Sequence, residues 1–92
     1  MPKLFRVGPY IIFFWSNEND EPIHVHIAVA KPSPNATKIW LTKGGGCIVA
    51  NNTSKISKHH LNELLEIIQN NHLFICDEWK TFFDVELVKF YC

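Results

Sequence analysis

Neither sign of charge predominates in this sequence, because nine lysine and arginine residues balance nine aspartate and glutamate residues. Proteins that bind nucleic acid through phosphate contacts usually carry a basic excess or patch, so the composition argues against non-specific nucleic-acid binding. A net charge near zero also weakens the repulsion that keeps proteins monomeric. We therefore expect the partner to be another small protein or a second copy of this chain.

Long apolar runs and paired cysteines are also missing. No stretch reaches the roughly 20 apolar residues that span a bilayer, and the run 10–15 is too short for a secretion signal. The three cysteines are widely spaced, without the Cys-x-x-Cys pair of a zinc knuckle or the even count of a disulfide framework. These absences predict a cytoplasmic protein with no membrane partner.

The residues that are present predict one folded domain over 1–92. A hydrophobic content of 47% is typical of a globular protein rather than a disordered one. A chain of this size buries most of one core but is too short for two.

Strand-like runs separated by turn residues fill the first half of the sequence. They lie at residues 4–7, 10–15, 23–29, 37–42 and 47–50. Gly8-Pro9 predicts a hairpin between the first two runs. Because the second run is apolar on both faces, we expect a central strand or one covered on both sides. The pattern predicts an antiparallel β-meander of four or five strands over about residues 3–50.

The second half changes to a helical period. Ser57 is a candidate N-cap, Asn70-Asn71 interrupts the pattern, and a second helical stretch continues to about residue 84. Residues 84–92 suit either a returning strand or more helix. The sequence therefore predicts an α+β fold, in which the meander packs against two helices over about residues 57–84. The side chains expected to pack on the sheet are Leu61, Leu64, Leu65, Ile68 and Trp79.

His24 and His26 are the strongest candidates for chemistry. Side chains at i and i+2 of a strand share a face and start about 7 Å apart, so both imidazoles can reach one metal ion or one reacting group. A structural role, lining a half-exposed strand face, is the alternative. A metal site needs a third ligand, and Glu18, Asp20 and Glu21 precede the strand and are candidates to supply it or to orient an imidazole. The alternative is that these three carboxylates are solvated loop residues.

Four further residues are candidates for binding or catalysis. Arg6 lies in a predicted strand whose neighbouring residues are apolar, so it could reach across the sheet to a carboxylate or phosphate, or form an edge-strand salt bridge. Trp40 is large enough to anchor a ligand, although aromatic residues at strand spacing are usually core. Lys38 and Glu21 complete a candidate binding group around it.

Several short motifs together resemble a known family. They are Met1-Pro2-Lys3-Leu4-Phe5-Arg6, Phe13-Phe14-Trp15-Ser16-Asn17-Glu18, Glu21-Pro22-Ile23-His24-Val25-His26-Ile27, Lys38-Ile39-Trp40-Leu41 and the region 61–83. In these the chain resembles the small prokaryotic domain of unknown function 4160. The family has no established activity, but its members are often encoded beside another small domain and frequently grouped with toxin–antitoxin components. The chain departs from the family pattern at residues 30–36, 44–46 and beyond 84.

Two functional hypotheses follow. The first is a non-catalytic interaction module, the partner-binding component of a two-gene toxin–antitoxin-like or regulatory pair, with no cofactor. The second is a small nuclease or metal-dependent hydrolase. It would use His24 and His26 as ligands or acid/base pair, a divalent metal, and Arg6 or Lys38 to stabilise phosphate charge.

Overall fold

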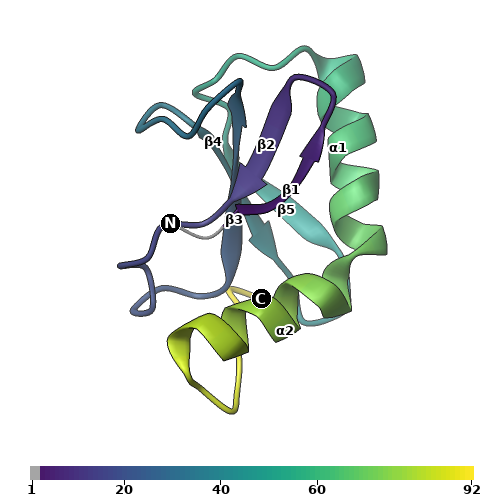
Figure 1. Cartoon of the computed structure of the whole chain (residues 1–92). Helices are drawn as coiled ribbons and strands as arrows, with labels where there is room; N and C mark the ends of the chain where they lie inside the picture. The colour runs from purple at the N-terminus through teal and green to yellow at the C-terminus, as the bar shows by residue number, and fades with distance from the viewer. Residues whose placement is uncertain (1–2) are drawn as a thin grey trace.

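A computed structural model describes residues 3–92, and it contains a five-stranded sheet followed by two helices (Figure 1). The elements are β1 (Lys3–Val7), β2 (Tyr10–Phe13), β3 (His24–Val29), β4 (Thr37–Leu41), β5 (Cys47–Asn51), α1 (Lys58–Asn70) and α2 (His72–Phe83). The predicted α+β class and element order are confirmed.

The sheet is an antiparallel meander in which each strand pairs with its neighbours in sequence, in the order β1-β2-β3-β4-β5. The predicted Gly8-Pro9 hairpin is present, since Val7 pairs with Tyr10 across the two-residue turn. Gly8 has a φ of 56°, a conformation that costs glycine little. β1 and β5 are the two edge strands.

Apolar side chains cover both faces of β2, as its sequence predicts. Ile12 belongs to the main core between the sheet and the helices, whereas Ile11 and Phe13 face a second, smaller cluster with Ala28 and Ala36. The alternation of a strand therefore divides the residues of β2 between two cores. The structure thus confirms that β2 is central and buried on both sides.

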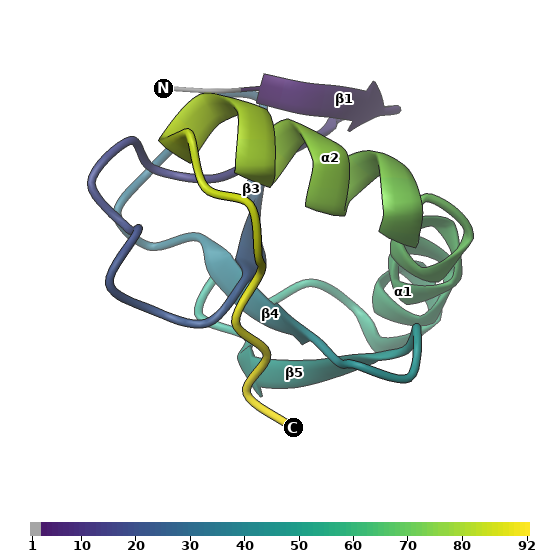
Figure 2. The same cartoon turned by 90° about the horizontal axis from the view of Figure 1, so that it is seen from below.

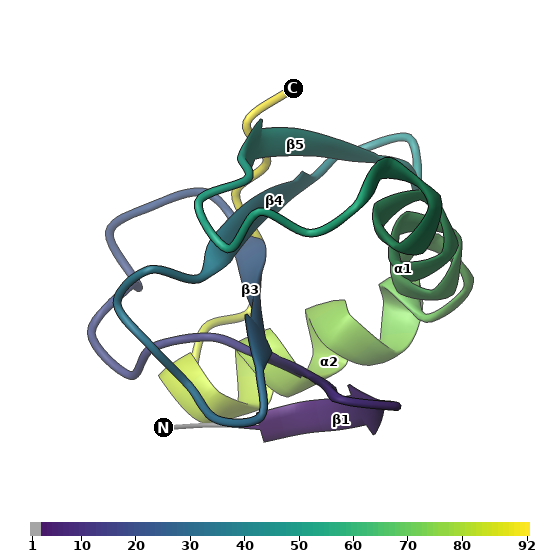
Figure 3. The ribbon, with the colours of Figure 1, turned by 90° about the horizontal axis from the view of Figure 1, so that it is seen from above.

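The two helices lie on one side of the sheet and run in different directions. Two opposite views agree that α2 lies along β1 and that α1 lies near β5 (Figures 2 and 3). The Ser57 hydroxyl accepts the N–H of His60 and caps α1, as predicted. Neither helix within residues 3–92 combines the length and apolar character needed to cross a membrane.

The predicted core residues of the helices pack on the sheet, but two of the five are only partly buried. Leu64, Ile68 and Trp79 are buried in the main core, and Leu61 and Leu65 pack against it while only partly buried. Leu65 lies toward the edge of the apolar stripe. We therefore expect Leu65 to contribute less to stability than a fully buried leucine does.

Residues 84–92 form neither the strand nor the helix that the sequence left open, so both alternatives were wrong. Asp84 adopts a left-handed conformation with φ of 54°, which ends α2. The tail then runs back beneath β3, β4 and β5 (Figure 2). Single backbone hydrogen bonds attach it, from Ile23 N–H to the Lys89 carbonyl and from Lys43 N–H to the Cys92 carbonyl, both 2.8 Å.

Candidate functional site

His24 and His26 lie on one face of β3, as the two-residue period predicts, with ring centroids 5.0 Å apart. Val25 and Ile27 alternate with them and enter the main core. The histidine face is not half-exposed, however, because His24 is fully buried and His26 is 8% exposed. The Trp79 ring of α2 lies 5.4 Å from that of His24, and the rings of Phe13 and Trp15 lie 5.4 and 6.3 Å from that of His26. Polar substitution at His24 is therefore less well tolerated than a half-exposed face would allow.

The loop between β2 and β3 brings Glu18 onto the histidine face. Its residues 16–20 are polar turn formers. Oε1 of Glu18 accepts the backbone N–H of Trp15 at 2.8 Å, and the Glu18 carbonyl accepts the N–H of Glu21 at 3.2 Å. These two local hydrogen bonds hold the loop in a conformation that turns the carboxylate toward β3.

Oε2 of Glu18 lies 2.9 Å from Nε2 of both His24 and His26. We call these three residues the Glu18 cluster. One ligand atom from each lies within 4.8 Å of the others, and no other such group of three metal-ligating side chains occurs within residues 3–92. The Glu18 side chain is 11% exposed and that of His26 is 10% exposed, so the cluster is nearly enclosed.

The two imidazoles contact the carboxylate differently. Nε2 of His26 forms hydrogen bonds with both Glu18 oxygens, at 2.9 and 3.1 Å. Nδ1 of His24 lies 2.8 Å from the Pro22 carbonyl, which can only accept, so Nδ1 carries the proton. Nε2 of His24 is close to Oε2 of Glu18 but does not meet the geometry of a hydrogen bond, and it is buried without a partner.

The surroundings keep Glu18 ionised. Burial by itself raises the pKa of a carboxyl group, but the polar contacts with His24 and His26 and the N–H of Trp15 outweigh it. The pKa of Glu18 therefore lies well below its ordinary value of 4.5.

The candidate binding residues Trp40, Lys38 and Glu21 meet beside the Glu18 cluster. Lys38 forms an ion pair with Glu21 and lies 4.2 Å above the Trp40 ring, as a cation–π contact. Trp40 pairs with His24 across the sheet and touches its ring edge, with centroids 5.4 Å apart. Tyr91 of the tail stacks on Trp40 at 5.0 Å. Lys38 and Glu21 thus neutralise one another, which leaves Glu18 as the anionic group facing the imidazoles.

Arg6 lies elsewhere. Its guanidinium donates to the carbonyl of Ala30 at 3.4 Å, in an exposed position on the edge strand β1. The structure therefore does not bring Arg6 to the histidine pair, contrary to the hypothesis that the three residues act together.

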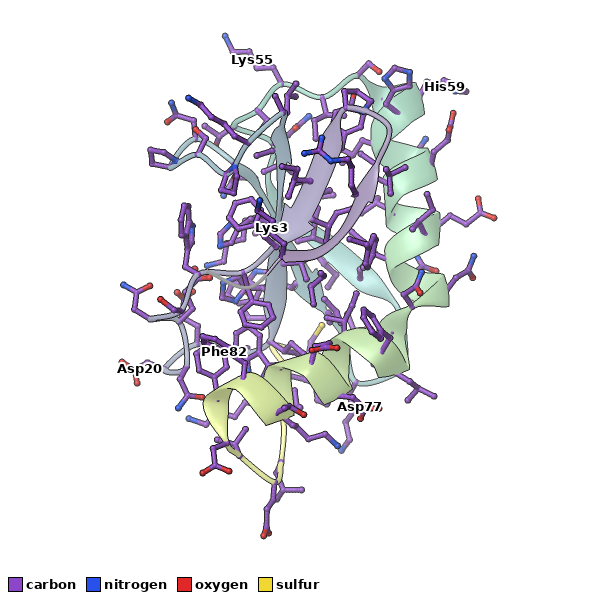
Figure 4. The ribbon with its side chains drawn as sticks, in the orientation of Figure 1. Lys3, Asp20, Lys55, His59, Asp77 and Phe82 are labelled. Atoms are coloured by element: carbon purple, nitrogen blue, oxygen red, sulfur yellow. The ribbon has the colours of Figure 1, made fainter. Side chains whose placement is uncertain are left out.

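The remaining histidines have local structural contacts. His59 forms an ion pair with Glu63 one turn later, at 2.8 Å, and projects from the start of α1 (Figure 4). His60 contacts the Tyr10 hydroxyl at 2.9 Å. His72 contacts the Thr42 carbonyl at 2.9 Å. Asp20 belongs to the loop that carries Glu18, and Figure 4 shows it on the opposite side of the molecule from His59. His59 is therefore remote from this loop.

A hollow of about 460 Å³ opens beside Glu18, lined by Trp15, Asn17, Glu18, Glu21 and Pro34. Glu18 is the member of the cluster that faces this hollow. Among the three carboxylates before β3, the structure selects Glu18 as the partner of both imidazoles. Sequence spacing could not make this choice, because a loop has no fixed period.

The comparisons with known proteins place the chain in a family but give no solved relative. No curated protein and no solved structure matches it. A family model described as "Domain of unknown function (DUF4160)" matches residues 10–80, which is most of the chain. The resemblance seen in the motifs is therefore confirmed, and this protein belongs to the DUF4160 family.

Proposed function

We propose that this protein is a non-catalytic interaction module that binds another small protein through the outer face of α2. We define that face by its exposed residues Leu73, Phe74, Asp77, Glu78 and Phe82. The observation that supports the proposal is that α2 exposes three large apolar side chains, Leu73, Phe74 and Phe82, in addition to those it buries. Its inner side already carries the buried Ile75, Cys76 and Trp79, so the exposed three are not needed for the core.

The exposure of this face is large for apolar side chains. Leu73 is 80% exposed, and Phe74 and Phe82 are each nearly half exposed. Single exposed apolar residues are common on protein surfaces, but several on one helix face are typical of a binding surface. Figure 4 labels Asp77 and Phe82 on this helix, and both are exposed, so α2 presents acidic as well as aromatic side chains to solvent.

The charges favour a different protein over a second copy. Asp77 and Glu78 lie at the middle of α2, whose bounds are His72 and Phe83. A two-fold pairing of this face would place the same carboxylates of two copies against each other, which is destabilising. A partner with an apolar groove bordered by lysine or arginine side chains fits better. As the family resemblance implies, we assign that partner to the same two-gene toxin–antitoxin-like or regulatory pair.

The test is capture of a partner by the tagged chain expressed in its native host. We expect one protein in stoichiometric amount, and Leu73→Asp should weaken its binding by about tenfold or more, the range of an interface hot spot. Ile48→Asp is the matched control, because Ile48 is an exposed apolar residue on β5. Raising the salt concentration should weaken the complex. Recovery of no stoichiometric partner, or equal effects of the two variants, would contradict the proposal.

A metal-dependent hydrolase is the second candidate, and the presence of Glu18 beside the histidine pair favours it. Two imidazoles and a carboxylate are the protein ligands of several zinc hydrolases. The geometry supports this candidate less, since Lys38 is paired with Glu21 and Arg6 contacts Ala30. Zinc-dependent cleavage of a phosphodiester that is lost in His26→Gln would support it. Absence of cleavage by the zinc-loaded chain would contradict it.

A further inference from the structure

We infer that the Glu18 cluster binds one divalent transition cation such as Zn²⁺, whether or not the chain acts as an interaction module. The starting observation is Nε2 of His24. This atom is buried and without a hydrogen-bond partner, and it is the only such buried side-chain nitrogen or oxygen within residues 3–92. Buried polar groups normally have a partner, so a missing one requires an explanation.

The local contacts direct the free Nε2 of His24 toward Oε2 of Glu18, and a cation would displace the Nε2 proton that His26 shares with Glu18. Nδ1–H of His24 donates to the Pro22 carbonyl, which leaves the lone pair of Nε2 available for a metal. The Trp15 N–H engages Oε1 of Glu18, so Oε2 is the oxygen that faces both imidazoles. Metal-ligating histidines commonly have this arrangement, in which the second ring nitrogen donates to a backbone carbonyl.

The distances between the ligand atoms suit one small cation. Zinc binds imidazole nitrogen and carboxylate oxygen at about 2.0 to 2.2 Å, so tetrahedral ligands lie about 3.4 Å from one another. The Glu18 contacts to the imidazoles are 2.9 Å, and all three ligand atoms lie within 4.8 Å. Shifts of side chains alone, by several tenths of an ångström, would bring them to zinc distances. A cation would also place positive charge between the carboxylate and the unpartnered Nε2.

The ligand types determine the class of ion. Two nitrogen donors favour zinc, cobalt or nickel, whereas magnesium and calcium prefer sites built from oxygen. Trp40 and Trp79 surround His24 with apolar rings, so the nitrogen side of the site is dry. The hollow beside Glu18 offers a route for the ion and room for water as the fourth ligand. A bound ion would join the loop of residues 14–22 to β3.

The test is titration of the full chain with Zn²⁺ alone after removal of metals by a chelator. We use the Cys92→Ser background, because Cys92 is an exposed thiol that can bind zinc by itself. Calorimetry should give one tight site per chain, and Mg²⁺ in large excess should not compete. Long-range ¹H–¹⁵N NMR spectra should show zinc-dependent shifts at Nε2 of His24 and His26.

Variants distinguish this site from surface imidazoles. Glu18→Gln and His26→Gln, each checked for folding by circular dichroism, should lower zinc affinity at least about tenfold, as loss of even a supporting contact does. His59→Gln is the matched control and should bind as the parent does, because His59 lies at the opposite end of the molecule from this loop. No zinc binding by the parent, or equal binding by the parent and both variants, would overturn the inference.

Discussion

Glu18 makes three polar contacts from a largely buried side chain, and its replacement measures their value. Glu18→Gln keeps the shape but removes the charge, so we expect a loss of about 1 to 3 kcal/mol in the free energy of unfolding at pH 7 in metal-free protein. Urea denaturation provides the measurement. Glu66→Gln, on the exposed side of α1, should change stability by less than about 0.5 kcal/mol.

The same carboxylate predicts a pH dependence. Because folding lowers the pKa of Glu18 below 4.5, its stabilising contribution is fully present above that pH and is lost as the pH falls toward the lowered value. The difference in unfolding free energy between the parent and Glu18→Gln should therefore shrink from pH 7 to pH 3. A difference that stays constant over this interval would show that the charge of Glu18 contributes nothing.

The three thiols should react at very different rates. Burial raises the pKa of both Cys47 and Cys76, and only the thiolate reacts quickly with alkylating reagents. Cys92 is exposed. Mass spectrometry after brief treatment with iodoacetamide at pH 8 should find Cys92 modified first. Early modification of Cys76 would instead indicate that α2 separates from the sheet easily.

Among the secondary-structure elements, α1 offers a comparison between two adjacent leucines. Leu64 is 2% exposed in the main core, whereas Leu65 only packs against the core. We expect Leu64→Ala to cost about 2 to 5 kcal/mol and Leu65→Ala distinctly less. Thermal and urea unfolding of the two variants provide the measurement. Equal losses would mean that the helix is rotated relative to the structure described here.

Elements with a regular period could be predicted from the sequence, and the histidine pair belongs to one of them. Alternation along β3 correctly placed His24 and His26 on one face. It could not show that both rings are buried, because the side chains around them come from other parts of the chain, Trp79 beside His24 and Phe13 beside His26. Nor could it choose Glu18 over Asp20 and Glu21, since that choice depends on the hydrogen bond from Trp15.

The tail was unpredictable for a related physical reason. Its apolar residues Val85, Val88 and Phe90 all pack against the main core, but at irregular intervals that match neither a strand nor a helix. Two isolated backbone hydrogen bonds, at Lys89 and Cys92, replace a regular ladder. Such a segment is defined by the surface it covers, and that surface exists only after the sheet has formed.

For the molecule as a whole, the tail should contribute substantially to stability. Removal of residues 85–92 exposes the apolar surface beneath the tail and deletes the stacking of Tyr91 on Trp40. We expect the free energy of unfolding to fall by about 2 kcal/mol or more. Tyr91→Ala in the full chain should have a smaller effect. A truncated chain as stable as the parent would show that the tail contacts are weak.

The hydrogen bond between Ile23 and Lys89 also implies an order of events during synthesis on the ribosome. The meander needs only contacts between neighbouring strands, which form early because they are close in sequence. The N–H of Ile23, which directly precedes His24, can form its hydrogen bond only after Lys89, 66 residues further along the chain, has been synthesised. We therefore expect His24 in the nascent sheet to remain open to the surrounding solution until Trp79 and the tail have been made and packed, so that an ion could enter before the fold is finished.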